Sequence, residues 1–215
     1  MPDTQRDAAD EPVVLAMRDI TKRFGPLIAN DDITLELRRG EILALLGENG
    51  AGKTTLMNIL FGHYVADEGE VLVEGVNGGL LPLEPGSPHA ALDAGIGMVH
   101  QHFTLAENLT GLENIVLGTG SRFSPRLSTG PARRKVAALM TQSGLTVDLD
   151  VQVTRLTVGE KQRVEILKAL YRDARILVMD EPTAVLTPQE AEGLFKTVRW
   201  LAQNGLAGIF IAPKL

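Results

Sequence analysis

The stretch from Gly47 to Thr55 holds the residue types best suited to chemistry. Gly47, Gly52, Lys53 and Thr54 match the pattern G-x-x-x-x-G-K-[ST]. Glycines let a backbone curl around an anion with its N–H groups pointing inward, and the positive end of a following helix adds attraction. Lys53 would reach the β- and γ-phosphates of a nucleotide, and the Thr54 hydroxyl would ligate Mg²⁺. We call residues 47–55 the phosphate loop.

The elements expected on either side support this interpretation. Ile42–Leu46 is a short apolar run, which predicts a buried strand, and Thr54–Phe61 predicts a helix that Gly62 ends. The alternative is a Gly-rich turn that carries a lysine by accident. The strand–loop–helix context disfavours that alternative.

Two adjacent carboxylates form the second candidate site. Asp180 and Glu181 follow Ile176–Met179, which predicts a fully apolar strand with an acidic tip. In phosphate-loop hydrolases an Asp at such a tip holds the Mg²⁺ shell, and a following Glu can polarise the attacking water. The alternative, a strand that runs into an acidic turn, is common. The upstream phosphate loop favours the catalytic role.

A third signal lies at Leu156–Glu160. Thr157 and Glu160 have capping-box spacing, which predicts the start of a helix over Val158–Asp173. A capped helix N-terminus with Gly159 in its first turn is also an anion site. Both roles are compatible.

Composition narrows the class of protein. The chain has 215 residues, enough for one large or two small domains, and a formal net charge of −6, which argues weakly against a general nucleic-acid binder. It has no Cys, which excludes disulfides and thiolate metal sites and fits a reducing compartment. No apolar run approaches the about 18 residues that span a bilayer. We therefore expect a soluble chain that reaches a membrane only through a partner.

Hydrophobic periodicity predicts an α/β core interrupted by a helical stretch. Residues 1–12 are polar and acidic and predict a disordered leader. Residues 13–104 and 157–215 are assigned to the core, and 105–156 to a helical subdomain. Strands are expected at Val13–Met17, Ile33–Leu37, Ile42–Leu46, Glu70–Gly75, Gly95–Val99, Ile176–Met179 and Gly208–Ala212, a turn at Thr21–Pro26 and a loop at Val76–Pro88. Further helices are expected at His89–Ala94, Leu112–Leu117, Pro131–Ser143 and Thr187–Asn204.

At these three motifs the chain resembles the nucleotide-binding domain of ATP-binding-cassette (ABC) proteins, over nearly all of Val13–Leu215. The resemblance implies a RecA-like P-loop NTPase core with an antiparallel β subdomain and an all-helical insert, and it implies ATP and Mg²⁺ as ligands. The residues implied to contact ATP are Phe24, Gly47, Glu48, Asn49, Gly50, Ala51, Gly52, Lys53, Thr54, Thr55, Thr157, Gly159 and Glu160. Those implied to bind metal are Thr54, Gln101 and Asp180, and the catalytic ones are Glu181 and Gln101. For Phe24, the aromatic that would stack on adenine, the alternative is a core phenylalanine.

Two segments, Met98–Phe103 and Asp180–Glu190, resemble those of sugar and nucleoside import ATPases, whose first cassette of two is the nearest match. The resemblance implies an ATP-hydrolysing importer subunit. It implies a cytoplasmic place on the inner face of the cell membrane, a second cassette, transmembrane permease subunits, indirectly a solute-binding protein, and no nucleic acid. A cassette acting on ribosomes or DNA is the alternative, which the acidic charge disfavours.

Three departures from the family pattern qualify these expectations. Thr157 replaces a serine, and Thr187 replaces the aspartate that usually ends the segment after Glu181. Pro213 stands where a histidine is typical, and proline has no side-chain donor and no N–H. The chain thus resembles a C-terminally truncated cassette, with a last strand that lacks a neighbour. The alternative function is a degenerate or regulatory cassette that binds nucleotide but hydrolyses it poorly.

Overall fold

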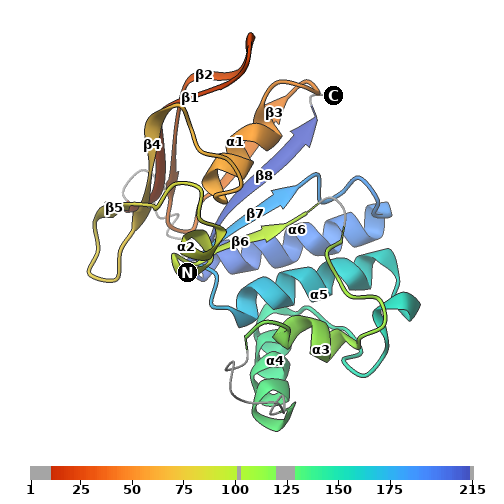
Figure 1. Cartoon of the computed structure of the whole chain (residues 1–215). Helices are drawn as coiled ribbons and strands as arrows, with labels where there is room; N and C mark the ends of the chain where they lie inside the picture. The colour runs from red at the N-terminus through yellow and green to blue at the C-terminus, as the bar shows by residue number, and fades with distance from the viewer. Residues whose placement is uncertain (1–10, 101–102, 120–128, 214–215) are drawn as a thin grey trace, which may run out of the picture.

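The computed structural model describes residues 11–100, 103–119 and 129–213. These residues form two four-stranded sheets (Figure 1). The antiparallel sheet has the order β2-β1-β4-β5 and the parallel sheet the order β3-β8-β7-β6. The strands are β1 (Val13–Phe24), β2 (Leu27–Arg38), β3 (Ile42–Gly47), β4 (Glu68–Glu74), β5 (Leu80–Pro82), β6 (Ile96–Val99), β7 (Ile176–Asp180) and β8 (Ala207–Pro213).

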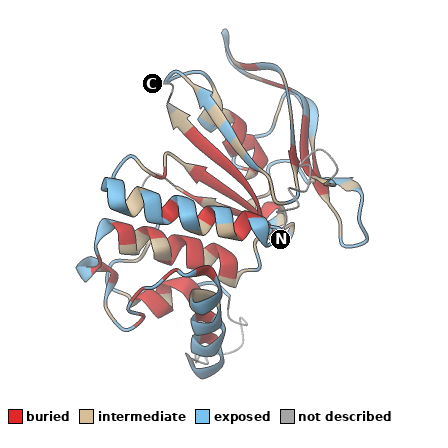
Figure 2. Ribbon diagram, turned by 180° about the vertical axis from the view of Figure 1, so that it is seen from behind, coloured by how far each residue is buried: buried red, intermediate tan, exposed pale blue. Residues whose placement is uncertain are grey.

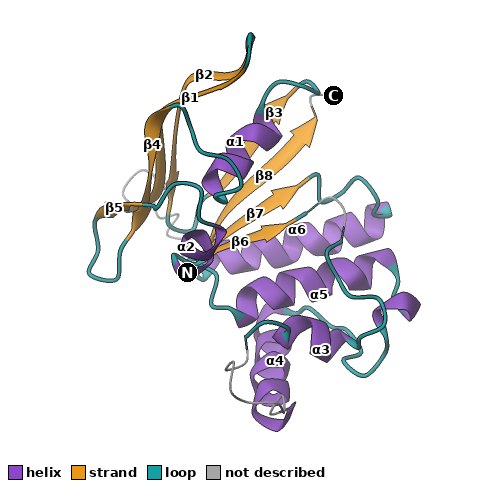
Figure 3. Cartoon of the chain, viewed as in Figure 1, coloured by secondary structure: helices purple, strands orange, loops and turns teal. Residues whose placement is uncertain are grey.

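Helices cover both faces of the parallel sheet, with α1 on one side and α5 and α6 on the other (Figure 3). The helices are α1 (Lys53–Leu60), α2 (Pro88–Asp93), α3 (Gly111–Val116), α4 (Thr129–Ser143), α5 (Val158–Tyr171) and α6 (Pro188–Gln203), with a 3₁₀ turn at Val153–Arg155. None of the helices in the described ranges has the length and apolarity needed to cross a bilayer.

Strand β7 explains how one sheet serves two cores. Ile176 and Val178 face the core shared with α1 and β1, whereas Leu177 and Met179 face the core shared with α5 and α6. Successive side chains of a strand point to opposite faces, so a continuous apolar run marks a strand buried on both. Figure 2 shows this burial in the central strands and in α5.

The parallel register aligns the carboxyl ends of the strands. Gly47 lies opposite Pro213, and Asp180 lies opposite Ile211, while β6 ends at Val99 beside Met179. Ligands of open α/β sheets bind at this edge. The fold therefore places the phosphate loop and the Asp180–Glu181 pair on one edge of the sheet.

The helices agree with the sequence predictions to within a few residues, but four strand predictions were wrong. β2 begins at Leu27, six residues before the expected Ile33, because it pairs with β1 from there on. β1 continues to Phe24 through most of the expected turn, because it pairs with β2 along its length. β3 is half-exposed rather than buried, with Leu46 63% exposed, because among the described strands it pairs only with β8. The last strand, β8, has neighbours on both sides, β3 and β7.

Two smaller differences concern segments expected to lack structure. The short strand β5 lies inside the expected loop Val76–Pro88, where it pairs with β4. Glu11 and Pro12, which the sequence placed in the leader, accept hydrogen bonds through their carbonyls from Arg38 and Arg39. Residues 1–10 lie outside the described ranges.

The helical stretch 105–156 does not pack separately. Ile115 of α3, Val136 of α4 and Leu149 belong to the same core as Val164 and Leu167 of α5. The subdomain boundaries stay a prediction.

Candidate nucleotide-binding site

The phosphate loop curls around the amine of its own lysine. The Lys53 ammonium group donates hydrogen bonds to the carbonyls of Gly47, at 2.6 Å, and Glu48, at 2.9 Å. Gly50 and Gly52 have φ angles of 82° and 79°, which a side chain would strain. A Cβ on Gly52 would also lie 2.1 Å from the Ala29 carbonyl oxygen. Only glycine fits this path of the backbone.

Helix α1 starts without a side-chain cap, since its N-cap residue is Gly52. The first N–H groups of a helix have no partner within the helix. Together with the helix dipole they attract an anion. Asn30 of β2 holds the loop from below, because its side-chain amide donates to the Gly52 carbonyl at 3.2 Å.

A groove of about 560 Å³ opens beside the loop. That volume suits a small-molecule ligand. It is lined by Phe24, Leu27, Ile28, Ala29, Asn49, Gly50, Ala51, Gly52, Lys53, Thr54, Thr55, Glu181 and Ile211. Gly47 and Glu48 do not line it and contribute the carbonyls that bind Lys53.

Phe24 is a surface residue of this groove. Its ring is 42% exposed, meets Tyr64 edge-on at 5.5 Å between centroids, and lies 5.4 Å from the Lys22 ammonium. The core alternative for Phe24 is therefore wrong. An exposed aromatic at the rim of the groove has the position needed to stack on a base.

At the tip of β7, the pKa of the Asp180 carboxyl is raised above its ordinary value. Partial burial raises the pKa of Asp180, and the adjacent Glu181 raises it further, while His100 and Lys53 act in the opposite direction. Glu181 has a φ of 46°, in the left-handed region, and its N–H donates to the Ile211 carbonyl at 3.0 Å. Strained backbone of this kind is concentrated at functional sites.

The donors available here fit Mg²⁺. In the described part of the chain, no cluster of three or more His, Cys, Asp or Glu forms a protein cage for a metal. Mg²⁺ typically takes one or two carboxylates plus substrate phosphates. Asp180 and the Thr54 hydroxyl can supply such oxygens, and a cation would stabilise the ionised form of Asp180, which burial and the adjacent Glu181 disfavour. Gln101, the third expected ligand, lies outside the described residues.

The segment at the start of α5 does not join the groove. Thr157 and Glu160 form the expected capping box: Glu160 accepts from the Thr157 N–H and hydroxyl at 2.8 and 2.9 Å. Gly159 is buried, and a Cβ there would lie 2.4 Å from a Glu190 carboxylate oxygen. The pKa of Glu190 is lowered, chiefly by the N–H and hydroxyl of Thr187.

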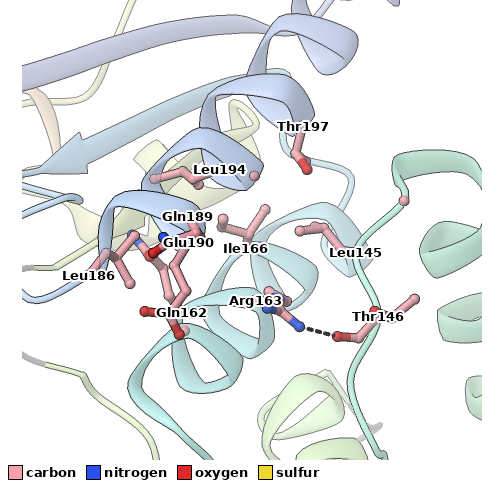
Figure 4. Close-up of a pocket in the computed structure, with 13 residues that line it drawn as sticks. Leu145, Thr146, Gln162, Arg163, Ile166, Leu186, Gln189, Glu190, Leu194 and Thr197 are labelled. Carbon is pink, nitrogen blue, oxygen red and sulfur yellow. Dashed lines mark hydrogen bonds between the residues drawn. The ribbon is translucent and has the colours of Figure 1, made fainter.

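Gly159 and Glu190 line the cavity shown in Figure 4. It has a volume of about 380 Å³, between α5 and α6, and Arg163 crosses it to donate to the Thr146 carbonyl at 2.9 Å. It shares no lining residue with the groove beside the phosphate loop.

Sequence reasoning missed three buried polar residues near the site: Asn30, Gln162 and Glu165. Gln162 and Glu165 resemble the solvated positions of any amphipathic helix. One sequence signal was available: Gly159, Gln162 and Glu165 are spaced three residues apart, which places them on one face of a helix.

A protein-family model described as ABC transporter matches residues 30–184, which include the phosphate loop and the Asp180–Glu181 pair. The chain belongs to the ABC transporter family. The match covers more than half of the chain, and it confirms the fold class and family expected from the motifs.

Curated relatives of this ABC family chain are named for import. It is 49% identical to the nucleoside import ATP-binding protein NupA of Lactococcus lactis over 94% of the chain and 39% of NupA. It is 44% identical to the glucose import ATP-binding protein TsgD13 of Haloferax volcanii, over 94% and 41%. It is 45% identical to the ribose import ATP-binding protein RbsA 1 of Burkholderia thailandensis, over 94% of the chain and 39% of that protein. The chain thus spans about two fifths of the length of these relatives.

Solved structures agree on the fold. The ADP conformation of MJ1267, an ATP-binding cassette of an ABC transporter, matches with a TM-score of 0.80 at 26% identity, over 94% of this chain and 82% of that one. cbiO1 from Clostridium perfringens, part of the ABC transporter complex cbiONQ, matches with a TM-score of 0.77 at 25% identity, over 95% of this chain and 80% of that one. The dimeric post-hydrolysis state of the cassette MJ0796, bound to ADP and Pi, matches with a TM-score of 0.73 at 26% identity, over 92% of this chain and 87% of that one.

Proposed function

We propose that this chain is the ATP-binding and ATP-hydrolysing part of an ABC importer for a sugar or a nucleoside. The observation that carries the proposal is the convergence of the phosphate loop, Asp180 and Glu181 on one edge of the parallel sheet. The names of the relatives, which import nucleosides, glucose and ribose, support the solute class.

The residues have distinct roles in this proposal. Phe24 stacks on adenine, while Lys53 and the uncapped N–H groups of α1 hold the phosphates. Glu181 positions a water for in-line attack on the γ-phosphate. Thr54, Asp180 and Gln101 would hold Mg²⁺, which supplies positive charge next to the phosphate oxygens. Hydrogen-bond donors that are already positioned where negative charge develops in the transition state usually lower the activation barrier more than any other single effect.

A second cassette completes the site. Thr157, Gly159 and Glu160 lie away from the groove of their own chain, which supports a role over the nucleotide of another cassette. That cassette is either a second copy or a further part of a longer protein. Its closing and opening would drive transmembrane permease subunits through residues 105–156 at the inner face of the membrane. A solute-binding protein would act on the outer side.

The test measures binding and hydrolysis separately. Lys53→Ala should weaken Mg-ATP binding about 10- to 100-fold, since hydrogen bonds to charged groups contribute roughly 1.5–3 kcal/mol. Glu181→Gln should leave binding intact and lower hydrolysis about 10²- to 10⁴-fold. Hydrolysis per chain should rise with chain concentration, because two chains form the complete site.

The matched control is Glu192→Gln, an exposed carboxylate on α6 that pairs with Lys196 at 2.7 Å. It should change neither quantity. Tight binding that Lys53→Ala leaves unaltered, or hydrolysis that survives Glu181→Gln, would contradict the proposal.

A further inference from the structure

Two buried polar side chains of α5 bind the two loops next to the expected catalytic residues. Gln162 is 5% exposed, and its side-chain amide donates to the Pro182 carbonyl at 2.7 Å. Glu165 is 3% exposed, and one carboxylate oxygen accepts from the Thr104 N–H at 2.7 Å and the Thr104 hydroxyl at 2.9 Å. Residues three apart share a helix face, so one face of α5 holds both loops.

Packing alone does not call for these polar groups. The neighbouring positions Val164, Ile166 and Leu167 are fully buried and apolar. A buried carboxylate is costly unless it is hydrogen-bonded and paired. Glu165 has two hydrogen bonds from Thr104 and a more distant cation, the Lys168 ammonium at 3.7 Å. Its partners make it a specific connection between α5 and the segment after β6.

The sequence positions of the partners give the connection its meaning. Pro182 directly follows Glu181, and Thr104 lies three residues after Gln101. The other end of the same helix begins at Thr157, in the segment expected to meet the nucleotide of a second cassette. A hydrogen-bonded helix of 14 residues transmits a displacement of its first turn along its length.

We propose that Glu165, with Gln162, is a positioning residue that links the first turn of α5 to the loops after Gln101 and Glu181. Contact between that turn and a second nucleotide then changes where both loops lie, so each site responds to occupancy of the other. The roles of Gln101 and Glu181 in this inference rest on the proposed function, whereas the link itself rests on the contacts of Gln162 and Glu165.

The first test reads the link without activity. Amide hydrogen exchange at Thr104 reports its bond to Glu165. Glu165→Met, which keeps the length of the side chain and removes both acceptors, should speed this exchange at least tenfold. Glu165→Gln keeps one acceptor and should restore part of the protection. Glu192→Met, on the exposed face of α6, is the control and should change nothing.

The second test asks whether a change at the start of α5 alters amide exchange at Thr104. Thr157→Ala removes the capping hydroxyl and should speed exchange at Thr104 about threefold or more in the wild-type background. It should add nothing in the Glu165→Met background, where the link is already broken. An equal effect in both backgrounds, or unchanged Thr104 exchange in folded Glu165→Met, would refute the inference.

The third test separates binding from turnover. Glu165→Met should leave the Kd for Mg-ATP within about twofold, because the hydrogen bonds and the ion pair of Glu165 go to Thr104 and Lys168, outside the phosphate loop. It should lower kcat tenfold or more. Thr104→Val, at an exposed position that should not affect folding, deletes one of the two hydrogen bonds and should produce a smaller fall in kcat. A kcat that stays at the wild-type value in both variants refutes coupling to Glu181. If the wild-type chain itself neither binds nor hydrolyses ATP, the proposed function fails, and the two exchange experiments still decide the link.

Discussion

The ionised carboxylate of Asp180 destabilises the fold. Its carboxyl loses hydration at the tip of β7 and lies next to Glu181, and both effects raise its pKa above the ordinary 3.8. A raised carboxyl pKa means that the protonated form suits the fold, so stability is full below pH 3.8 and is lost as pH rises through the folded-state pKa. The ionised group therefore strains the nucleotide-free fold at neutral pH, where a cation would relieve it.

Asp180→Asn should consequently raise the Tm of the nucleotide-free chain at pH 7 to 8, by roughly 2–4 °C for each kcal/mol recovered. The gain should shrink as pH falls through the folded-state pKa and should be absent well below pH 3.8, where the Asp180 carboxyl is protonated in both the folded and the unfolded chain. Thermal melts over a pH series measure it. Asp150→Asn is the control of opposite sign, because a hydrogen bond from Arg133 lowers the pKa of Asp150. A Tm that falls in both variants would contradict this account.

At the residue scale, motif residues could be predicted and their buried supports could not. Lys53, Asp180 and Glu181 follow from spacing and from the apolar runs before them. Asn30 and Glu165 look like ordinary polar surface positions, since a single sequence does not say which polar side chain meets a backbone group elsewhere. Their role depends on contacts with residues 22 and 61 positions away.

Among the elements, the starts of α5 and α6 depend on each other. Both helices begin with a capping box, and Glu190, which caps α6, also covers Gly159 in the first turn of α5. A larger residue at position 159 would displace the carboxylate that completes the α6 cap. The two helix starts therefore behave as one unit.

Gly159→Ala and Glu190→Ala should accordingly be non-additive. A Cβ at position 159 meets Glu190 in the wild-type background but has room once Glu190 is gone, where alanine gains helix propensity. The coupling energy in urea unfolding should be at least about 0.5 kcal/mol. Gly193→Ala, which faces open space on α6, is the control and should add to Glu190→Ala without coupling. Independent effects of Gly159→Ala and Glu190→Ala would show that the contact is energetically silent.

Local signals explain which elements could be predicted. The capping boxes at Thr157 and Thr187 lie within four residues, so both helix starts were predicted. The continuation of β1 to Phe24 depends on pairing with β2 and β4. The edge position of β3 depends on β8, more than 160 residues later in the chain. Periodicity within a window carries no information about such partners.

Across the whole molecule, the groove draws on residues from Phe24 to Ile211. A ligand that contacts β2, the phosphate loop and the segment after β7 binds only the folded chain. Ligand binding of this kind stabilises by mass action. The groove thus links nucleotide affinity to global stability.

Mg-ATP at about a hundred times its Kd should add about 2.7 kcal/mol to the free energy of unfolding. For a chain of this size the Tm should rise by roughly 5–11 °C. Lys53→Ala, with a Kd about 10- to 100-fold weaker, should remove from about half to about five sixths of the rise at the same nucleotide concentration. A Tm that does not change with Mg-ATP, or a full rise in the Lys53→Ala variant, would contradict nucleotide binding at the phosphate loop.

The edge position of β3 has a consequence for solubility. Among the described strands only β8 pairs with β3, so the backbone N–H and C=O groups of its other side have no strand partner there, and the side chains of Ile42 and Leu46 are exposed. Such an edge is a template on which strands of other chains can add, and proteins commonly protect it with charges. Yet β3 also ends at Gly47, where the phosphate loop begins. The strand with this edge therefore leads directly into the phosphate loop, and charges placed on β3 to prevent aggregation would also act on a phosphate bound at that loop.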